Sequence, residues 1–203
     1  MAGTPNNWSV VVRGAWNPAI LTPAGIAKRV LGLEDGTPVE VLVALDKPGL
    51  LRVVQQNIAV SPSMGQLLIE PTAQQAAGEL KRAADCARRA VQSLPETPLT
   101  ACGVNLKYTF DALSDQMTEM FESSLDDSLA DDNRQITGRF MRRVVTWNEG
   151  VINIEIEERA DASGSLTFNF HRDSTMPVEH SNWLGRTDEM VAAAEHLLPI
   201  FGA

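Results

Sequence analysis

The chain has 203 residues, of which 44% are hydrophobic and 21% charged, and its formal net charge is −9. These values are ordinary for a globular protein with a core of its own. The negative charge argues against general binding to nucleic acid, which needs clustered Lys and Arg. No apolar run is long enough to span a bilayer, and residues 1–8 carry no basic segment followed by an apolar one. We therefore expect neither a membrane span nor a signal peptide.

The chain contains two cysteines, Cys86 and Cys102. They fall on a predicted helix and a predicted strand, without metal-ligand spacing and without the cysteine density of a secreted disulfide scaffold. We expect a soluble, cytoplasmic protein in which both thiols are unpaired core residues.

The first half of the chain predicts a strand, a short helix, three strands and a long helix. Thr22 followed by Pro23 is typical of a helix N-cap with proline at the first helical position. Thr72 and Gln75 have the spacing of a capping box for the long helix. The elements are expected at residues 8–13, 23–31, 39–45, 50–60, 65–70 and 72–94.

The second half predicts the same order of elements. It opens with the clearest strand of the chain, Leu99–Phe110, because apolar and polar residues alternate there and Pro95 and Pro98 end the preceding helix. Gly103 within this strand indicates a bulge or a close backbone approach. The elements of this half are expected at residues 99–110, 113–129, 139–147, 151–157, 166–170 and 184–198.

The repeated order predicts an α+β fold built by internal duplication of a β-α-β-β-β-α unit, with half-repeats at residues 8–95 and 99–200. One half alone would bury too little apolar surface to be stable. We therefore expect a single pseudo-symmetric domain over residues 1–203. Its two halves would form one continuous antiparallel sheet of about eight strands, with both long helices on one face.

This order of elements resembles that of TATA-binding-protein-like folds, in which two strand-helix-strands-helix halves form a saddle. The resemblance covers nearly the whole chain and implies the fold alone, since it carries no functional residue over and the basic DNA-reading face is missing. Residues 97–108, TPLTACGVNLKY, are also similar to a strand of uncharacterised bacterial proteins, which implies no activity.

We find no motif for catalysis or for cofactor binding. His171, His180 and His196 lack the spacing of metal ligands, and they are read as structural or solvated histidines with a ligand or general base as the alternative. The chain has no phosphate-binding glycine loop and no nucleophile elbow. We therefore assign no catalytic, metal or cofactor residue, although distant side chains could still assemble a site.

The strongest anomaly in composition is the acidic segment 111–132, which has no Lys or Arg. It is read as a solvated helix face followed by a flexible loop, or as a docking surface for a basic partner. The interaction candidates in this segment are Asp126, Asp127, Asp131 and Asp132.

The basic cluster of the chain is Arg139, Arg142 and Arg143, and Arg139 and Arg143 share one face of their predicted strand. Together with Trp147, Arg139 and Arg143 are candidates for a contact with a protein partner, because Trp and Arg are enriched at interaction hot spots. The alternative is a charged strand edge that discourages aggregation.

The sequence leaves three functions open. The first is a non-catalytic protein-interaction or assembly subunit that uses an exposed sheet face and the acidic helix and loop, with a protein partner or a second copy of the chain bound there. The second is a small-ligand binder with a pocket between the sheet and the helices. The third is an enzyme whose site has no recognisable motif. The exposed face would carry residues such as Leu42, Ala44, Val145 or Trp147.

Overall fold

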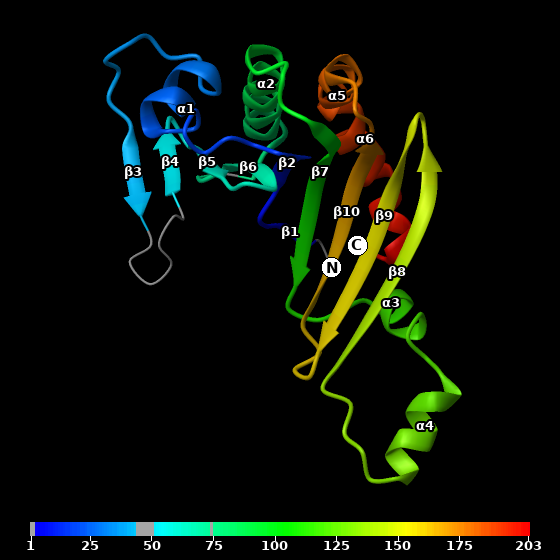
Figure 1. Ribbon diagram of the computed structural model, residues 1–203. Coiled ribbons are helices and arrows are strands. Elements are labelled where there is room, and N and C mark those ends of the chain that lie inside the picture. The colour runs from blue at the N-terminus through cyan, green and yellow to red at the C-terminus, as the bar shows by residue number, and fades with distance from the viewer. Residues whose placement is uncertain (1–2, 44–50, 74) are drawn as a thin grey trace.

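The computed structural model of the protein describes residues 3–43, 51–73 and 75–203. Within them, ten strands form one antiparallel sheet in the order β3-β4-β5-β6-β2-β7-β10-β9-β8, and the short β1 pairs with β7 beside this path (Figure 1). The strands are β1 Thr4–Pro5, β2 Ser9–Gly14, β3 Glu40–Val43, β4 Leu51–Gln55, β5 Ile58–Pro62, β6 Gln66–Pro71, β7 Leu99–Phe110, β8 Gly138–Trp147, β9 Gly150–Arg159 and β10 Gly164–Asp173. The expected α+β class and the large antiparallel sheet are confirmed.

The helices that cover the sheet lie on one of its faces. Figure 1 shows α1, α2 and α5 along one side of the sheet and α6 behind β9 and β8, whereas α4 stands apart, beyond the end at which β8 begins. The helices are α1 Pro23–Arg29, α2 Ala77–Ser93, α3 Asp115–Glu119, α4 Ser124–Asp131, α5 Pro177–Leu184 and α6 Thr187–Leu197, followed by the 3-10 helix η1 Leu198–Phe201.

β7 lies at the centre of the sheet and has the predicted alternation. Cys102, Val104 and Leu106 are fully buried against the helices. The other face of the strand carries Gly103 and Asn105 and has no helix over it. One edge of β7 pairs with β2 and β1, and the other pairs with β10 along ten residues. The buried hydrophobic side chains of both halves of the chain form one core cluster around this strand.

The two halves use the same strand order. In the second half β7 is central and is followed outward by β10, β9 and β8; in the first half β2 is central and is followed outward by β6, β5 and β4. The central strands β2 and β7 pair antiparallel. The halves differ in that the first has the additional edge strand β3, and the second replaces one long helix by α5 and α6.

Three expected elements are divided in the structure. The strand predicted at residues 50–60 is the hairpin β4–β5, because Gln56 and Asn57 both have positive φ, which suits a tight two-residue turn. The helix predicted at residues 113–129 is interrupted between α3 and α4, and the helix predicted at 184–198 begins earlier and divides into α5 and α6. Ala44, at the end of the strand predicted at residues 39–45, lies outside the described residues.

One of the two predicted helix caps is present. Thr22 Oγ1 accepts a hydrogen bond from the Gly25 backbone N–H at the start of α1, as the sequence predicts. The capping box at Thr72 and Gln75 is wrong, since α2 begins at Ala77. The Gln75 side chain instead accepts a hydrogen bond from the backbone N–H of Trp8 at 2.6 Å, which ties the start of β2 to the loop before α2.

Both cysteines are free and buried, as the sequence predicts. Burial raises the pKa of the Cys102 thiol to about 12 and also raises the pKa of Cys86, so both remain protonated at neutral pH. In the described part of the chain, every helix is too short or too polar to cross a membrane.

His180 on α5 is a fully buried titratable group, and one of its ring nitrogens, Nε2, donates a hydrogen bond to the Ser174 carbonyl oxygen at 2.8 Å. Burial lowers its pKa below the usual 6.5, and this outweighs the opposing effects of the Ser174 hydrogen bond and the Glu179 carboxylate; Arg172 lowers the pKa further. The folded state thus binds a proton at His180 less readily than the unfolded state does. Stability is therefore lost as the pH falls through 6.5.

We expect His180→Gln, whose amide can still donate to Ser174, to flatten this part of the pH dependence. Urea unfolding at about pH 7.5 and about pH 5.5 measures the effect. The free energy of unfolding should fall more steeply on acidification in the wild-type protein than in the variant. Equal losses in the two proteins would show that His180 is not the responsible group.

Candidate functional site

A polar hollow of about 620 Å³ lies on the face of the sheet that the helices leave uncovered. Its lining comes from six strands, β6, β2, β7, β10, β9 and β8, so it crosses the junction between the two halves of the chain. Side chains that point away from the core line it, because successive residues of a strand point to opposite faces. We call it the open-face hollow.

Three asparagines form a row along the open-face hollow. Asn105 on β7 is the direct cross-strand partner of Asn169 on β10, and Asn169 is the partner of Asn153 on β9. Asn169 Nδ2 donates to Asn105 Oδ1 at 2.5 Å, and Asn153 Nδ2 donates to Asn169 Oδ1 at 2.7 Å. The row runs perpendicular to the strands because the three asparagines are direct cross-strand partners in the sheet.

Two further side chains extend this row at its ends. Asn105 Nδ2 donates to Ser9 Oγ on β2 at 3.0 Å, and Arg142 Nη2 on β8 donates to Asn153 Oδ1 at 2.6 Å. The result is a relay of four hydrogen bonds across five strands, with every donor pointing in the same direction, from Arg142 towards Ser9. Bonds aligned in this way polarise one another, so the relay is expected to be stronger than four isolated bonds.

The asparagines keep unused hydrogen-bonding capacity. An asparagine amide has two N–H donors and an oxygen with two lone pairs. In the relay, Asn105, Asn169 and Asn153 each donate once and accept once through their side chains. Each therefore keeps one N–H and one lone pair for a bound molecule. Asn153 is only 5% exposed, so a partner there would meet a group that is already largely desolvated.

The hollow is deep at Gly103, which lies beside the row on β7. A Cβ atom at this position would lie 3.1 Å from Asn169 Nδ2 and 3.3 Å from the carbonyl oxygen of Phe170. β7 pairs with β10 without a register shift here, so of the two sequence interpretations the close backbone approach is correct and the bulge is wrong. The missing side chain allows Asn169 and the backbone of Phe170 to lie close to β7 beside the relay.

Charged side chains of both signs line the hollow, with Arg13 and Arg142 as its cations and Asp173 as its carboxylate. Arg13 on β2 has no ion pair or side-chain hydrogen bond to any described residue, and Arg142 lies 3.7 Å from Glu155. His171, the cross-strand partner of Gly103, contacts the exposed Asp173 through Nε2 at 2.9 Å. The hollow thus combines the neutral amides of the row with two guanidinium groups and one carboxylate, in a chain of net charge −9.

The predicted acidic candidates lie on and just after α4, away from the open-face hollow. Asp126 pairs with Arg139 at 2.8 Å, and Asp132 pairs with Arg134. Asp127 and Asp131 are exposed and have no ion pair with any described residue. Serine side chains accept hydrogen bonds from backbone N–H groups at the starts of α3 and α4. These N-caps stabilise the two helices of the acidic segment.

The structure separates the predicted arginine and tryptophan cluster. Arg139 is held by two carboxylates, Asp126 at 2.8 Å and Glu158 at 2.6 Å. Trp147 packs edge-on against Phe170 and Trp183, so it belongs to the helix-covered side of the sheet and is half-buried. Arg143 lies on the same side of β8 as Trp147 and is exposed. These three residues therefore do not form one open surface. Of the other residues expected on the uncovered face, Leu42 lies there and Val145 does not.

Neither the comparisons with known proteins nor the residues of the hollow indicate a known activity. No protein-family model matches the chain, and no curated protein matches it. No group of three or more His, Cys, Asp and Glu side chains in the described residues has the arrangement of a metal site. The resemblance to TATA-binding-protein-like folds stays a prediction.

The asparagine row was missed by the sequence analysis, although its members stand at outward positions of well-predicted strands. The available signal was the amide residue at the outward position of three separate strands. Which amides meet depends on strand order and register, because a shift of one residue would turn an asparagine to the other face.

We expect Asn169→Leu to destabilise the fold by about 1–3 kcal/mol, because it leaves Asn105 Oδ1 and Asn153 Nδ2 without partners in a partly desolvated hollow. The matched control is Thr167→Leu, on the same strand and face, whose side chain makes no hydrogen bond to a described residue. Urea unfolding of both variants measures the difference. Equal stabilities would mean that water replaces the relay without cost.

Proposed function

We propose that this protein is a non-catalytic binding subunit that holds an extended segment of a partner polypeptide in the open-face hollow. The observation that carries the proposal is the asparagine relay, whose unused donors and acceptors line a face without covering helices. A polypeptide backbone also alternates one donor and one acceptor per residue, so its peptide groups complement the amides of the relay.

The charges in the hollow favour a partner segment with acidic side chains. Arg13 and Arg142 stand on β2 and β8, near opposite ends of the relay, and guanidinium groups bind carboxylates through paired N–H donors. Because the rest of the chain is acidic, such a segment would be repelled elsewhere on the surface. Electrostatics would therefore place the segment in the hollow.

The acidic helix and loop remain the second part of this proposal. Asp127 and Asp131 would contact a basic region of the same partner, and Asp126 and Asp132 would have to leave Arg139 and Arg134 to join them. Their exposure is the support for this role, and exposure alone is also what a solubilising surface requires. We therefore rest the proposal on the hollow and treat the acidic contact as additional.

We also infer that the sheet arose by internal duplication of one unit. The support is the equivalent order β2-β6-β5-β4 and β7-β10-β9-β8, together with the antiparallel pairing of the two central strands. On this view the hollow lies at the seam between the two copies. Its polar residues come mainly from the second copy, so the copies would have diverged in function.

The other two functions have less support. An enzyme would require a nucleophile or an acid-base pair at the site. The hollow offers His171 with the exposed Asp173, and the nucleophile in its lining, Cys102, is fully buried and keeps its proton because burial raises the pKa of its thiol. A small-ligand pocket between the sheet and the helices would use a different cavity, on the helix-covered side of the sheet.

A peptide-display selection tests the proposed function. We expect random twelve-residue peptides selected on the wild-type protein to be enriched in Asp and Glu, since Arg13 and Arg142 would select them. The affinity of a selected peptide should fall about tenfold for Arg142→Gln, which removes one guanidinium contact worth about 1.4 kcal/mol.

Arg29→Gln is the control for the selection, because Arg29 is exposed on α1 on the other side of the sheet and loses the same charge. It should leave peptide affinity unchanged. A second variant, Asn169→Leu, should weaken binding without removing a charge. Peptides that bind all three variants as tightly as the wild-type protein would refute the hollow as the binding site.

A further inference from the structure

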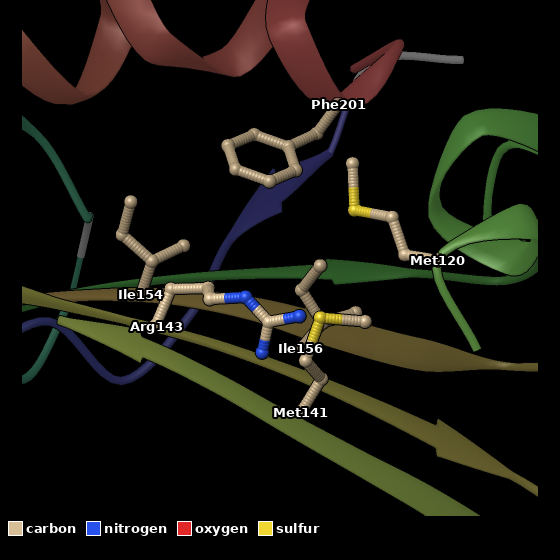
Figure 2. Close-up of a pocket in the computed structure, with 6 residues that line it drawn as sticks. All are labelled: Met120, Met141, Arg143, Ile154, Ile156 and Phe201. Atoms are coloured by element: carbon tan, nitrogen blue, oxygen red, sulfur yellow. The ribbon is translucent and has the colours of Figure 1, made fainter.

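A second cavity lies on the helix-covered side of the sheet, about 340 Å³ in volume and separate from the open-face hollow. Its floor is formed by β8 and β9, through Met141, Ile154 and Ile156. Its other walls are Met120, at the end of α3, and Phe201 in η1 (Figure 2). We call it the apolar pocket.

The guanidinium of Arg143 enters this apolar pocket. Figure 2 shows the Arg143 side chain extending from β8 between the two isoleucines, with its nitrogen atoms facing the space below the Phe201 ring. Its one hydrogen bond to a described residue is from Nη1 to the backbone oxygen of Arg142 at 3.1 Å. In the described part of the chain no carboxylate lies within ion-pair distance of Arg143.

This lack of a carboxylate sets Arg143 apart from the other arginines of β8. Arg139 is neutralised by Asp126 and Glu158, and Arg142 lies near Glu155 on the opposite face. Among the described residues of a chain with 26 acidic and 17 basic residues, Arg143 is thus a cation without a counter-charge, exposed to solvent and also part of the lining of the apolar pocket. A bound anion with an apolar body would pair with the Arg143 guanidinium and would also contact the apolar side chains around it.

A hydrogen bond fastens one wall of the apolar pocket. Ser114 Oγ donates to the Phe201 backbone oxygen at 2.5 Å, which fastens η1 to the start of α3. Ile154, Ile156 and Phe201 are almost fully buried, whereas Met120 is 39% exposed. The pocket therefore has a fixed floor and one flexible methionine at its side, and methionine adapts readily to ligand shape.

We propose that the apolar pocket binds a small carboxylate with an unbranched apolar tail, of the class of medium-chain fatty acids. The carboxylate pairs with the Arg143 guanidinium, and the tail lies between Ile154, Ile156, Met141 and the Phe201 ring. The cavity volume is at the lower end of the range for small-molecule sites, which fits one short chain and excludes a bulky ring system. This assignment does not depend on the open-face hollow.

Isothermal titration with decanoate, below its micelle concentration, tests the proposal. We expect saturable binding that weakens about tenfold in Arg143→Gln, which keeps part of the stem and removes the charge. Decanol, which has the same tail without the charge, should bind weakly and equally to both proteins. Hexanoate should bind more weakly than decanoate by about fourfold for each buried methylene that it lacks.

Two further variants separate pocket occupancy from charge. Met120→Trp places a larger side chain at the flexible wall and should abolish decanoate binding, with near-ultraviolet circular dichroism confirming that the fold is kept. Arg29→Gln, with its charge loss on the surface of α1, should bind decanoate as the wild-type protein does.

Three results would overturn the assignment: no saturable decanoate binding, equal binding by Arg143→Gln, or decanol binding as tight as that of decanoate. The peptides selected by display on the wild-type protein test whether the two sites are independent. They should bind Arg143→Gln normally, because Arg143 lies on the opposite face of β8 from Arg142. Failure of one site therefore does not imply failure of the other.

Discussion

The structure depends on the pairing of β7 with β2 on one side and with β10 on the other, because these pairings join the two halves of the chain into one sheet. β7 has twelve residues and fully buried side chains on its helix-facing side. Fixing its register fixes the faces of its neighbours, since side chains alternate with a period of two. The core on one face and the polar hollow on the other are therefore set by the same hydrogen-bond ladders.

The asparagine relay has a structural as well as a functional consequence. An uncovered sheet face with apolar side chains would invite association, whereas isolated buried amides would be costly. The row avoids both problems, because the side chains of Asn105, Asn153 and Asn169 are polar and hydrogen-bond to one another across the strands. They also penalise register shifts, since moving β9 or β10 by one residue would bury an amide in the core. The same row can specify the fold and remain available to a partner.

Much of the fold could be predicted from local patterns, whereas the site could not. The strand at Leu99–Phe110, the cap at Thr22 and the α+β class follow from alternation and capping chemistry. The β4–β5 hairpin was missed because its turn is Gln56-Asn57, without the glycine that usually marks such turns. Gln75 was assigned to a helix cap because its real partner, the backbone of Trp8, is distant in sequence.

The two sites required the three-dimensional structure for different reasons. The hollow depends on which strands are neighbours, and the apolar pocket depends on η1 lying close to β8 and β9, which are far from it in sequence. Trp147 was expected at a surface because tryptophan near arginine is typical of interfaces. In the fold, Trp147 instead packs against Phe170 and Trp183. Its arginine neighbour is Arg186, whose guanidinium lies 5.1 Å from the centre of the ring.

The adjacent residues Arg142 and Arg143 show how one edge strand can serve both faces. Successive side chains of β8 point to opposite sides, so Arg142 reaches the asparagine relay and Arg143 reaches the apolar pocket. In the described residues Arg143 has no carboxylate within ion-pair distance, whereas Arg142 lies 3.7 Å from Glu155. Arg139 lies four residues before Arg143 on the same face of β8. Its charge is already neutralised by two carboxylates. The difference between these arginines lies in their partners rather than in their sequence context. For this reason the basic cluster was interpreted as one surface in the sequence, whereas in the fold its members lie on two faces of β8 with different partners.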